Sequence, residues 1–214
     1  VGEPLFERGA RVSIGGGARV APGRMALVEI GPGRARVIEE LGRPDRAADV
    51  LAALLLEREL PAGFSGKVDG EAAEVAARPP GDRGERRDLT DLPTLTVDPA
   101  TARDFDDAVS ASETDGGVRL WIHIADVAAH VRPDSHLDRE ARRRANSTYV
   151  PGTVVPMLPF ALSSGACSLS PGAERLAVTT EIELAGDGTP RSTRFYRSRI
   201  RSDARLDYEQ LDEI

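Results

Sequence analysis

The chain has 214 residues, a formal net charge of −7 and a single cysteine, Cys167. This length is enough for one large or two small domains. One cysteine excludes an internal disulfide framework, and we expect Cys167 to be buried and inert in a reducing compartment. No apolar run approaches the roughly 20 residues that cross a bilayer, and the first residues lack the pattern of a signal peptide. We therefore expect a cytoplasmic protein without membrane contact.

The charge distribution is uneven. A negative total argues against a protein that coats nucleic acid, because phosphate binding depends on clustered cations. Arginines nevertheless gather at 142–144 and again between 191 and 205, in the series Arg191, Arg194, Arg197, Arg199, Arg201 and Arg205. These runs are consistent with positive grooves, and equally with a genome that favours arginine, since Lys67 is the only lysine.

Short strands separated by glycine turns are predicted near the beginning of the chain. Apolar runs at 10–14, 25–30 and 35–41 alternate with glycine-rich segments. An oligonucleotide-binding barrel needs about five strands. Residues 1–44 are therefore predicted to form a partial OB-like β-barrel.

A helical connector is predicted next. Asp45 is placed to cap a leucine-rich helix that stops before Pro61, and apolar spacing predicts a second helix over 67–77. Residues 78–87 mix proline, glycine and charge without periodicity, which is typical of a linker. We expect residues 45–87 to join two parts of the protein.

The remaining residues, 88–214, have the pattern of an α+β body. Strands are predicted at 95–97, 118–124, 176–184 and 194–200, with Gly186-Asp187-Gly188 forming the turn of a hairpin. Ser135 has the spacing of a capping box and is predicted to begin a helix that runs to Ala145. The whole chain therefore reads as α+β, with no internal repeat.

Four aspartates crowd one short segment. They are Asp98, Asp104, Asp106 and Asp107. Carboxylates this close raise one another's pKa unless hydrogen bonds or a metal ion offset the repulsion. Mg²⁺ is a hard ion that binds carboxylate oxygens, and two ions about 4 Å apart can drive phosphodiester hydrolysis.

A calcium-binding EF-hand and a solvated acidic loop are the two alternatives to a magnesium site. An EF-hand is excluded, because Val109 and Asp115 stand where that calcium loop requires glycine and glutamate. A fully solvated acidic loop is not excluded by residue type alone. At this point the cluster is either such a loop or a metal site.

The residues around the four aspartates resemble a known motif, and this resemblance favours the metal site over the solvated loop. Asp98-Pro99, followed after three residues by Arg103-Asp104-Phe105-Asp106-Asp107-Ala108, resembles the first motif of the RNase II/RNase R exoribonuclease family, the RNB domain. Further segments follow in the family's order, at 123–127, 137–141, 149–152, 155–159, 162–163 and 167–169. The resemblance is specific over 88–214 and looser over 9–80, where it implies the end of a cold-shock-like barrel and a short helical connector. It implies an incomplete RNB-type mixed α/β catalytic domain, because the family's domain is expected to extend beyond Ile214.

The resemblance also implies an activity. It points to a Mg²⁺-dependent 3′-to-5′ exoribonuclease that hydrolyses single-stranded RNA to nucleoside 5′-monophosphates, with one or two ions, Mn²⁺ as a possible substitute and no small-molecule cofactor. Asp98 and Asp107 resemble direct ligands, Asp104 a supporting ligand, and Asp106 the residue most needed for cleavage. Catalytic and metal-binding roles are thus expected for all four aspartates.

Roles in RNA binding or in the core are expected for several other side chains. Tyr149 resembles the family's aromatic clamp, which stacks on bases, with a core tyrosine as the alternative. Arg103 is expected to bind phosphate or to balance the acidic charge. Core positions are expected for Trp121, Phe105 and Met157, and structural roles for His123 and Asp126.

Two other functions stay open. The chain alone is expected to bind magnesium weakly and to degrade RNA poorly, so a catalytically silent RNA-binding module or scaffold is one alternative. A DNA nuclease with similar carboxylates is the other, and the 2′-hydroxyl of RNA distinguishes it.

Overall fold

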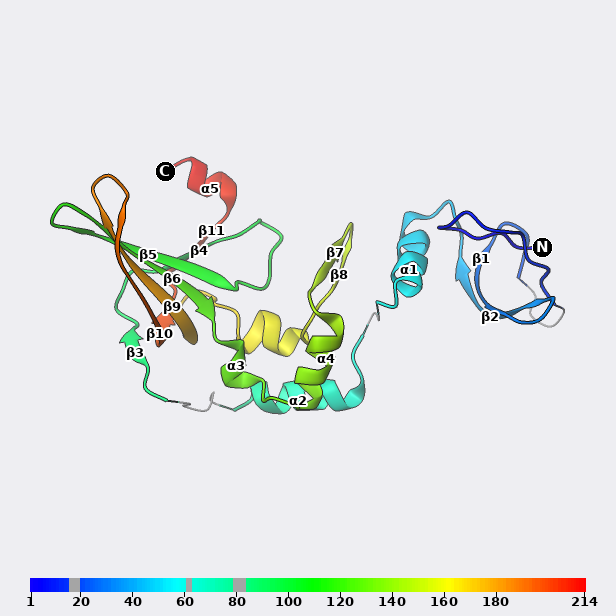
Figure 1. Cartoon of the computed structure of the whole chain (residues 1–214), viewed down its shortest axis with the longest axis horizontal. Helices are drawn as coiled ribbons and strands as arrows, with labels where there is room; N and C mark the ends of the chain where they lie inside the picture. The colour runs from blue at the N-terminus through cyan, green and yellow to red at the C-terminus, as the bar shows by residue number, and fades with distance from the viewer. Residues whose placement is uncertain (16–19, 61–62, 79–83) are drawn as a thin grey trace. The chain divides into compact units, whose positions relative to one another are not determined.

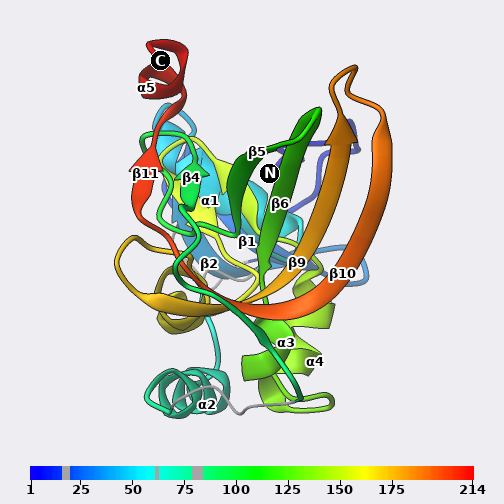
Figure 2. The ribbon, with the colours of Figure 1, turned by 90° about the vertical axis from the view of Figure 1, so that its left-hand side faces the viewer.

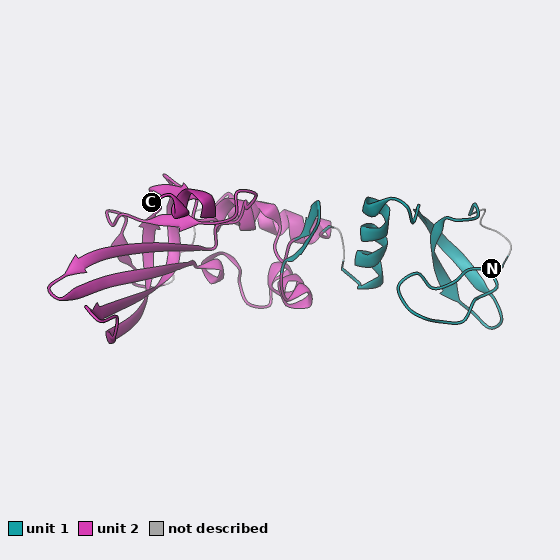
Figure 3. Cartoon of the chain, turned by 90° about the horizontal axis from the view of Figure 1, so that it is seen from above, with its two compact units in different colours: residues 1–63, 147–155 teal, residues 64–146, 156–214 magenta. Residues whose placement is uncertain are grey.

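The computed structural model describes residues 1–15, 20–60, 63–78 and 84–214. The chain forms two compact units (Figures 1 and 3). The first unit contains Val1–Gly63 with Ser147–Val155, and the second contains Phe64–Asn146 with Pro156–Ile214. The predicted mixture of helices and strands is confirmed. The predicted domain borders after residues 44 and 87 stay predictions.

The first unit is built around a two-stranded antiparallel sheet. Strands β1 (Met25–Ile30) and β2 (Ala35–Gly42) pair from Ile30↔Ala35 outward, around a turn in which Gly33 has φ +78°. The strand predicted over 10–14 is wrong, because that segment makes only isolated bridges at Val12 and Ile14. Its residues are mostly exposed, so little apolar burial favours a longer ladder there.

Helix α1 (Ala47–Glu57) follows in this unit. Its N-cap is Arg46 without a side-chain cap, so the predicted cap at Asp45 is wrong. Asp45 pairs instead with the guanidinium of Arg43, which competes for its carboxylate. The helix ends before Pro61, which lies outside the described residues. A small hairpin of β7 (Thr148–Val150) and β8 (Thr153–Val155) completes the unit.

The second unit contains a curled seven-stranded sheet (Figure 2). The strand order is β11-β4-β5-β6-β9-β10-β3, with parallel pairing only at β11/β4 and β10/β3. The bounds of the strands are β3 Arg87–Leu89, β4 Leu95–Val97, β5 Asp107–Thr114, β6 Gly117–Ala125, β9 Glu174–Ala185, β10 Pro190–Arg201 and β11 Ala204–Leu206. The predicted strands 118–124, 176–184 and 194–200 are confirmed and extend slightly further.

Among the described residues, four helices lie at one end of this sheet (Figure 2). They are α2 (Gly66–Ala76), α3 (Val127–His130), α4 (His136–Arg144) and the π-helix η1 (Ala161–Ala166), while α5 (Tyr208–Asp212) follows β11. Ser135 caps α4 by accepting from the amide of Asp138 at 3.1 Å, so the predicted helix start is confirmed. The Asp138 carboxylate accepts from the amide of Asp134 instead of completing a capping box.

The main core lies between these helices and the sheet. Small side chains line the sheet side, and leucines from α4 and η1 fill the helix side. Its buried members include Val68, Ala72, Ala108, Leu137, Leu162, Ala177 and Ile200. Cys167 joins this core at 4% exposure, and burial raises the pKa of its thiol to about 12, as expected of an inert cysteine.

In the described part of the chain, no helix is long and apolar enough to cross a membrane.

Candidate metal centre at the β4–β5 connection

The acidic segment joins two neighbouring antiparallel strands. Asp98 directly follows β4, and Asp107 is the first residue of β5. β4 and β5 pair in opposite directions through Leu95↔Val109. The end of one strand and the start of the next therefore meet at the same edge of the sheet, which brings the aspartates from both ends of the loop to one place.

The loop between these strands is fastened to its neighbours. The Arg205 guanidinium donates to the carbonyl of Pro99 at 2.8 Å and lies 5.2 Å from the centre of the Phe105 ring. The amide of Phe105 donates to the Ser168 hydroxyl at 3.1 Å, and its carbonyl accepts from the amide of Leu169 at 2.8 Å. Loop shape is thus set by β11 on one side and by the segment after η1 on the other.

Backbone bonds also fix the two ends of the acidic segment. The amide of Asp98 donates to the carbonyl of Leu206 at 3.1 Å, and the carbonyl of Asp106 accepts from the amide of Ala125 at 2.9 Å. Asp107 is in register with Ile124 of β6. The backbone that carries the carboxylates is therefore held by β11 at Asp98 and by β6 at Asp106 and Asp107.

Asp98 is the most buried of the four aspartates, with 9% of its surface exposed. Burial, and next the charge of Asp107, raise its pKa above the usual range, whereas Thr96 and Arg205 act in the opposite direction. Its buried Oδ2 atom has no hydrogen-bond partner among the described residues. A buried carboxylate oxygen without a partner calls for a cation or a proton.

Asp106 also has a raised pKa. The causes are partial burial first, and then the negative charges of Asp104, Asp107 and Asp98. Since the side chain still contacts solvent, screening weakens these effects. The carboxylates repel one another, so a divalent cation would relieve this repulsion.

The residue types present fit a magnesium ion, because all four donors are hard carboxylate oxygens. In the described ranges, however, no three acidic, histidine or cysteine side chains are gathered closely enough to form a complete metal cage. The structure brings the four aspartates to one charged edge without assembling them into such a cage. Their assignment as ligands stays a prediction.

The predicted RNA-binding residues lie in different units. Arg103 is exposed on the acidic loop. Tyr149 lies on β7 in the other compact unit, where 64% of its surface is exposed, so the alternative of a core tyrosine is wrong. In proteins that bind single strands, exposed aromatic rings stack on bases. The clamp role itself stays a prediction.

The expected core and structural residues are found as follows. Trp121 is buried at 8% exposure, and both Phe105 and Met157 are half-buried against the main core. His123 is fully buried with both ring nitrogens hydrogen-bonded, which confirms a satisfied structural histidine. Asp126 is buried in an ion pair and is structural as expected.

Its partner, Arg86, was missed by the sequence reading. Arg86 donates to Asp126 Oδ2 at 2.7 Å. It lies in the segment that was predicted to be a linker, and an arginine in a charged stretch gives no sequence signal for burial.

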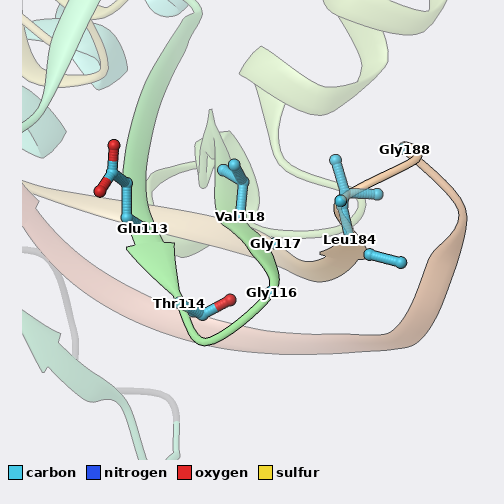
Figure 4. Close-up of a pocket in the computed structure, with 9 residues that line it drawn as sticks. Glu113, Thr114, Gly116, Gly117, Val118, Leu184 and Gly188 are labelled. Atoms are coloured by element: carbon cyan, nitrogen blue, oxygen red, sulfur yellow. The ribbon is translucent and has the colours of Figure 1, made fainter.

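A separate hollow lies between the turns of the β5–β6 and β9–β10 hairpins (Figure 4). Its volume is about 510 Å³, and its lining includes Glu113, Val118 and Leu184. Thr114, at its rim, lies seven positions after Asp107 on β5, which corresponds to about 23 Å along an extended strand. The hollow is therefore not part of the acidic site.

Comparison with known proteins identifies the family. The profile of the RNB domain matches residues 86–214. Ribonuclease R of Escherichia coli (strain K12) is 39% identical over 181 residues, which make up 84% of this chain and 22% of that protein. Ribonuclease R of Chlamydia pneumoniae is 48% identical over 130 residues, covering 60% of this chain and 19% of that protein. The chain thus spans about a fifth of these relatives' length.

A solved structure agrees with this result. The structure of Mycoplasma genitalium RNase R in complex with double-stranded RNA matches with a TM-score of 0.83 and 30% identity, over 94% of this chain and 37% of that one. The fold of the chain, including its curled sheet, thus matches that of the corresponding part of this structure. Since the matched region spans more than half of the 214 residues, the chain belongs to the RNB domain family.

Proposed function

We propose that this chain provides the metal-binding part of a Mg²⁺-dependent 3′-to-5′ exoribonuclease that hydrolyses single-stranded RNA to nucleoside 5′-monophosphates. Family membership and relatives named Ribonuclease R support the reaction class. A structural relative, Mycoplasma genitalium RNase R, is described in complex with ribose methylated single-stranded RNA. The observation that carries the proposal is the buried, unpartnered Oδ2 of Asp98 beside three other aspartates.

We infer the roles of the aspartates from the family resemblance, and their surroundings are consistent with these roles. Asp98 and Asp107 stand at the two ends of the loop and would hold Mg²⁺ from both strands. When bound, the ion would neutralise phosphate charge and favour ionisation of the attacking water. Asp106 has a raised pKa, which suits a carboxylate that orients that water and holds its proton. Asp104 adds negative charge that favours cation binding.

The RNA would be held by contacts that do not depend on sequence. Exposed Tyr149 would stack on a base, which is worth about 1–3 kcal/mol per base in proteins that bind single strands. Arg103 would pair with phosphate, so its contribution should weaken as salt rises. Such contacts suit an enzyme that moves along a strand of any sequence.

A graft tests the proposed reaction. The matching segment of E. coli Ribonuclease R would be replaced by this chain, and 5′-labelled single-stranded RNA would be followed with Mg²⁺. We expect progressive shortening from the 3′ end and release of nucleoside 5′-monophosphates. Asp106→Asn should leave the RNA intact, while Asp115→Asn, in the exposed β5–β6 turn, should not change the rate. Equal rates for Asp106→Asn and the unmodified graft would refute the proposal.

The same samples separate the alternatives. An RNA-binding scaffold predicts that the graft holds RNA equally well with EDTA or with Asp106→Asn, and that it never cleaves. A DNA nuclease predicts that DNA of the same sequence is shortened as fast as RNA. The proposed exoribonuclease predicts Mg²⁺-dependent cleavage of RNA alone.

A further inference from the structure

A row of buried polar side chains crosses the sheet beside the acidic edge. Thr94 precedes β4, Ser110 lies on β5, His123 on β6, Thr179 on β9 and Ser198 on β10. None is more than 4% exposed. Consecutive members are hydrogen-bonded, at 2.8, 3.1, 2.9 and 2.6 Å in this order. We call these five residues the polar row.

The hydrogen bonds of the polar row fit a single proton order. The Thr94 hydroxyl donates to the carbonyl of Leu92 at 2.8 Å, so it must accept from Ser110. Ser110 has then spent its proton and accepts from His123 Nε2. His123 Nδ1 consequently accepts from Thr179, and Thr179 accepts from Ser198. In the reverse order, each hydroxyl would donate towards β10, and the last proton would go from the Ser198 hydroxyl to the carbonyl of Ala177. That contact is 3.4 Å long and therefore weaker than the 2.8 Å bond from Thr94 to Leu92.

A neutral imidazole is essential to this order. An imidazolium donates from both nitrogens, so it would leave the Thr179 hydroxyl without its acceptor. Burial lowers the pKa of His123 to about 4, which keeps the ring neutral near pH 7. Every proton in the row is therefore used once, and a fully satisfied buried network rigidifies the elements that it joins.

The polar row ends where the backbone ladder is thinnest. In the described chain, β4 and β5 share one registered pair, Leu95↔Val109, whereas β5 and β6 share eight. The Thr94–Ser110 bond lies immediately beside that pair. Thr94 is also bonded to Asp203 through its backbone. The carbonyl of Thr94 accepts from the amide of Asp203 at 2.7 Å, and the amide of Thr94 donates to the Asp203 carboxylate at 2.9 Å. Side chains thus supplement a pairing that few backbone bonds support.

We propose that the polar row is a positioning device that holds β4 against β5 and so fixes the separation between Asp98 and Asp107. The inference rests on the proposed metal-binding function, because that separation matters only if both carboxylates serve one centre. Asp98 follows Thr94 by four residues, and Asp107 precedes Ser110 by three. None of the five row members is a ligand, and each acts through the strand that carries it.

The test uses matched changes of one hydroxyl. Thr94→Val removes the first hydroxyl at nearly constant volume, and Thr94→Ser keeps it. Thr114→Val is the control, since its buried hydroxyl lies on β5 without a hydrogen-bond partner among the described residues. Amide hydrogen exchange of β4 would be measured without metal, and Mn²⁺ affinity by EPR titration. NMR of ¹⁵N-labelled histidine would report which ring nitrogen of His123 carries the proton.

We expect Thr94→Val to speed exchange of the β4 amides and to weaken Mn²⁺ binding by about 10-fold, as is typical when a residue that supports a ligand is lost. Thr94→Ser and Thr114→Val should both behave like wild type. The histidine spectrum should show the proton on Nε2. If Thr94→Val does not fold, Ser110→Ala carries the same test.

Two results would overturn the inference. They are unchanged β4 exchange in Thr94→Val, or a Mn²⁺ affinity of that variant equal to that of wild type. A wild-type chain that binds no Mn²⁺ would contradict the proposed function instead. In that case the exchange of β4 alone decides whether the polar row holds the two strands together.

Discussion

Arg86 and Asp126 form an ion pair that is almost completely removed from solvent, with 2.7 Å between Arg86 Nη2 and Asp126 Oδ2 and 4% exposure of each side chain. The same guanidinium lies 3.4–3.5 Å from the carbonyls of Ser198 and Ala177. It thereby ties the segment before β3 to β9, β10 and the start of α3. A buried pair of this kind is costly to break, because the remaining charge is left without compensation.

Removing one member of this pair should be severely destabilising. We expect Asp126→Ala to lower the free energy of unfolding by about 3–5 kcal/mol. The double variant Arg86→Met/Asp126→Leu should recover much of that loss, since no buried charge remains. Urea unfolding of both proteins checks this. Arg78→Ala, which removes an exposed pair with Glu74, should change stability by less than about 1 kcal/mol.

Acid should weaken the fold through His123. Burial lowers its pKa from 6.5 to about 4 in the folded chain, so between these values only the unfolded chain takes up the proton. The neutral ring therefore contributes full stability above pH 6.5, and that contribution is lost as the pH falls towards 4. The loss amounts to about 3 kcal/mol. His130, whose pKa burial also lowers, acts in the same direction.

Urea unfolding between pH 4 and 7 measures this dependence. His123→Gln should flatten the slope of stability against pH over that range. His136→Gln, on the exposed side of α4, should leave the slope as in wild type. An identical slope in wild type and His123→Gln would show that the buried imidazole is not the source.

Neutralising the acidic edge should stabilise the metal-free chain. Raised pKa values for Asp98 and Asp106 mean that their charges oppose folding at neutral pH. Asp98→Asn should therefore raise Tm at pH 7, and a gain on the order of 1 kcal/mol corresponds to about 2–4 °C for a chain of this size. The difference should disappear below pH 3.8, the ordinary pKa of an aspartate.

Mg²⁺ should reverse this ranking. At 100 times its dissociation constant a bound ion stabilises the folded chain by about 2.7 kcal/mol. Wild type should gain that amount and Asp98→Asn should not, so thermal unfolding with and without Mg²⁺ checks the crossover. Equal gains in both proteins would place the ion elsewhere.

Two glycines should respond oppositely to alanine. A Cβ on Gly117 would lie 1.9 Å from the carbonyl oxygen of Leu184 on the neighbouring strand, so Gly117→Ala must push β6 from β9 and should cost about 1–3 kcal/mol or more. Gly70 lies in the interior of α2 with open space around it. Gly70→Ala should stabilise the chain by about 0.5–1 kcal/mol. The urea concentration at the midpoint of unfolding should be lower than that of wild type for Gly117→Ala and higher for Gly70→Ala.

The sequence predicted those helices and strands whose formation depends on a few consecutive residues. Alternating side chains located β6, and Ser135 located the start of α4, because burial of one face and a capping hydroxyl are properties of a few consecutive residues. The predicted cap at Asp45 failed because Arg43 competes for the same carboxylate. The π-helix at 161–166 has no periodic apolar face, so nothing in its sequence distinguishes it from a loop.

The site was predictable in composition and less so in geometry. Four aspartates in one string indicated a charged segment, and the structure places them at one end of the β4–β5 pair without assembling a metal cage among the described residues. Strand β5 was missed because its first residue, Asp107, belongs to the acidic string, and its serines and alanines resemble a loop. The polar row and Arg86 depend on residues far apart in the chain, and only the folded sheet brings them together.

The most direct measurement is Mn²⁺ binding by the 214-residue chain, followed by EPR with Mg²⁺ as competitor. Wild type should bind one or two ions that Mg²⁺ displaces. Asp98→Asn and Asp106→Asn should each weaken binding by about 10-fold or more, as expected when a ligand or its supporting group is removed. Asp115→Asn should bind as wild type does. Equal affinities in all four proteins would contradict a metal centre at the β4–β5 connection.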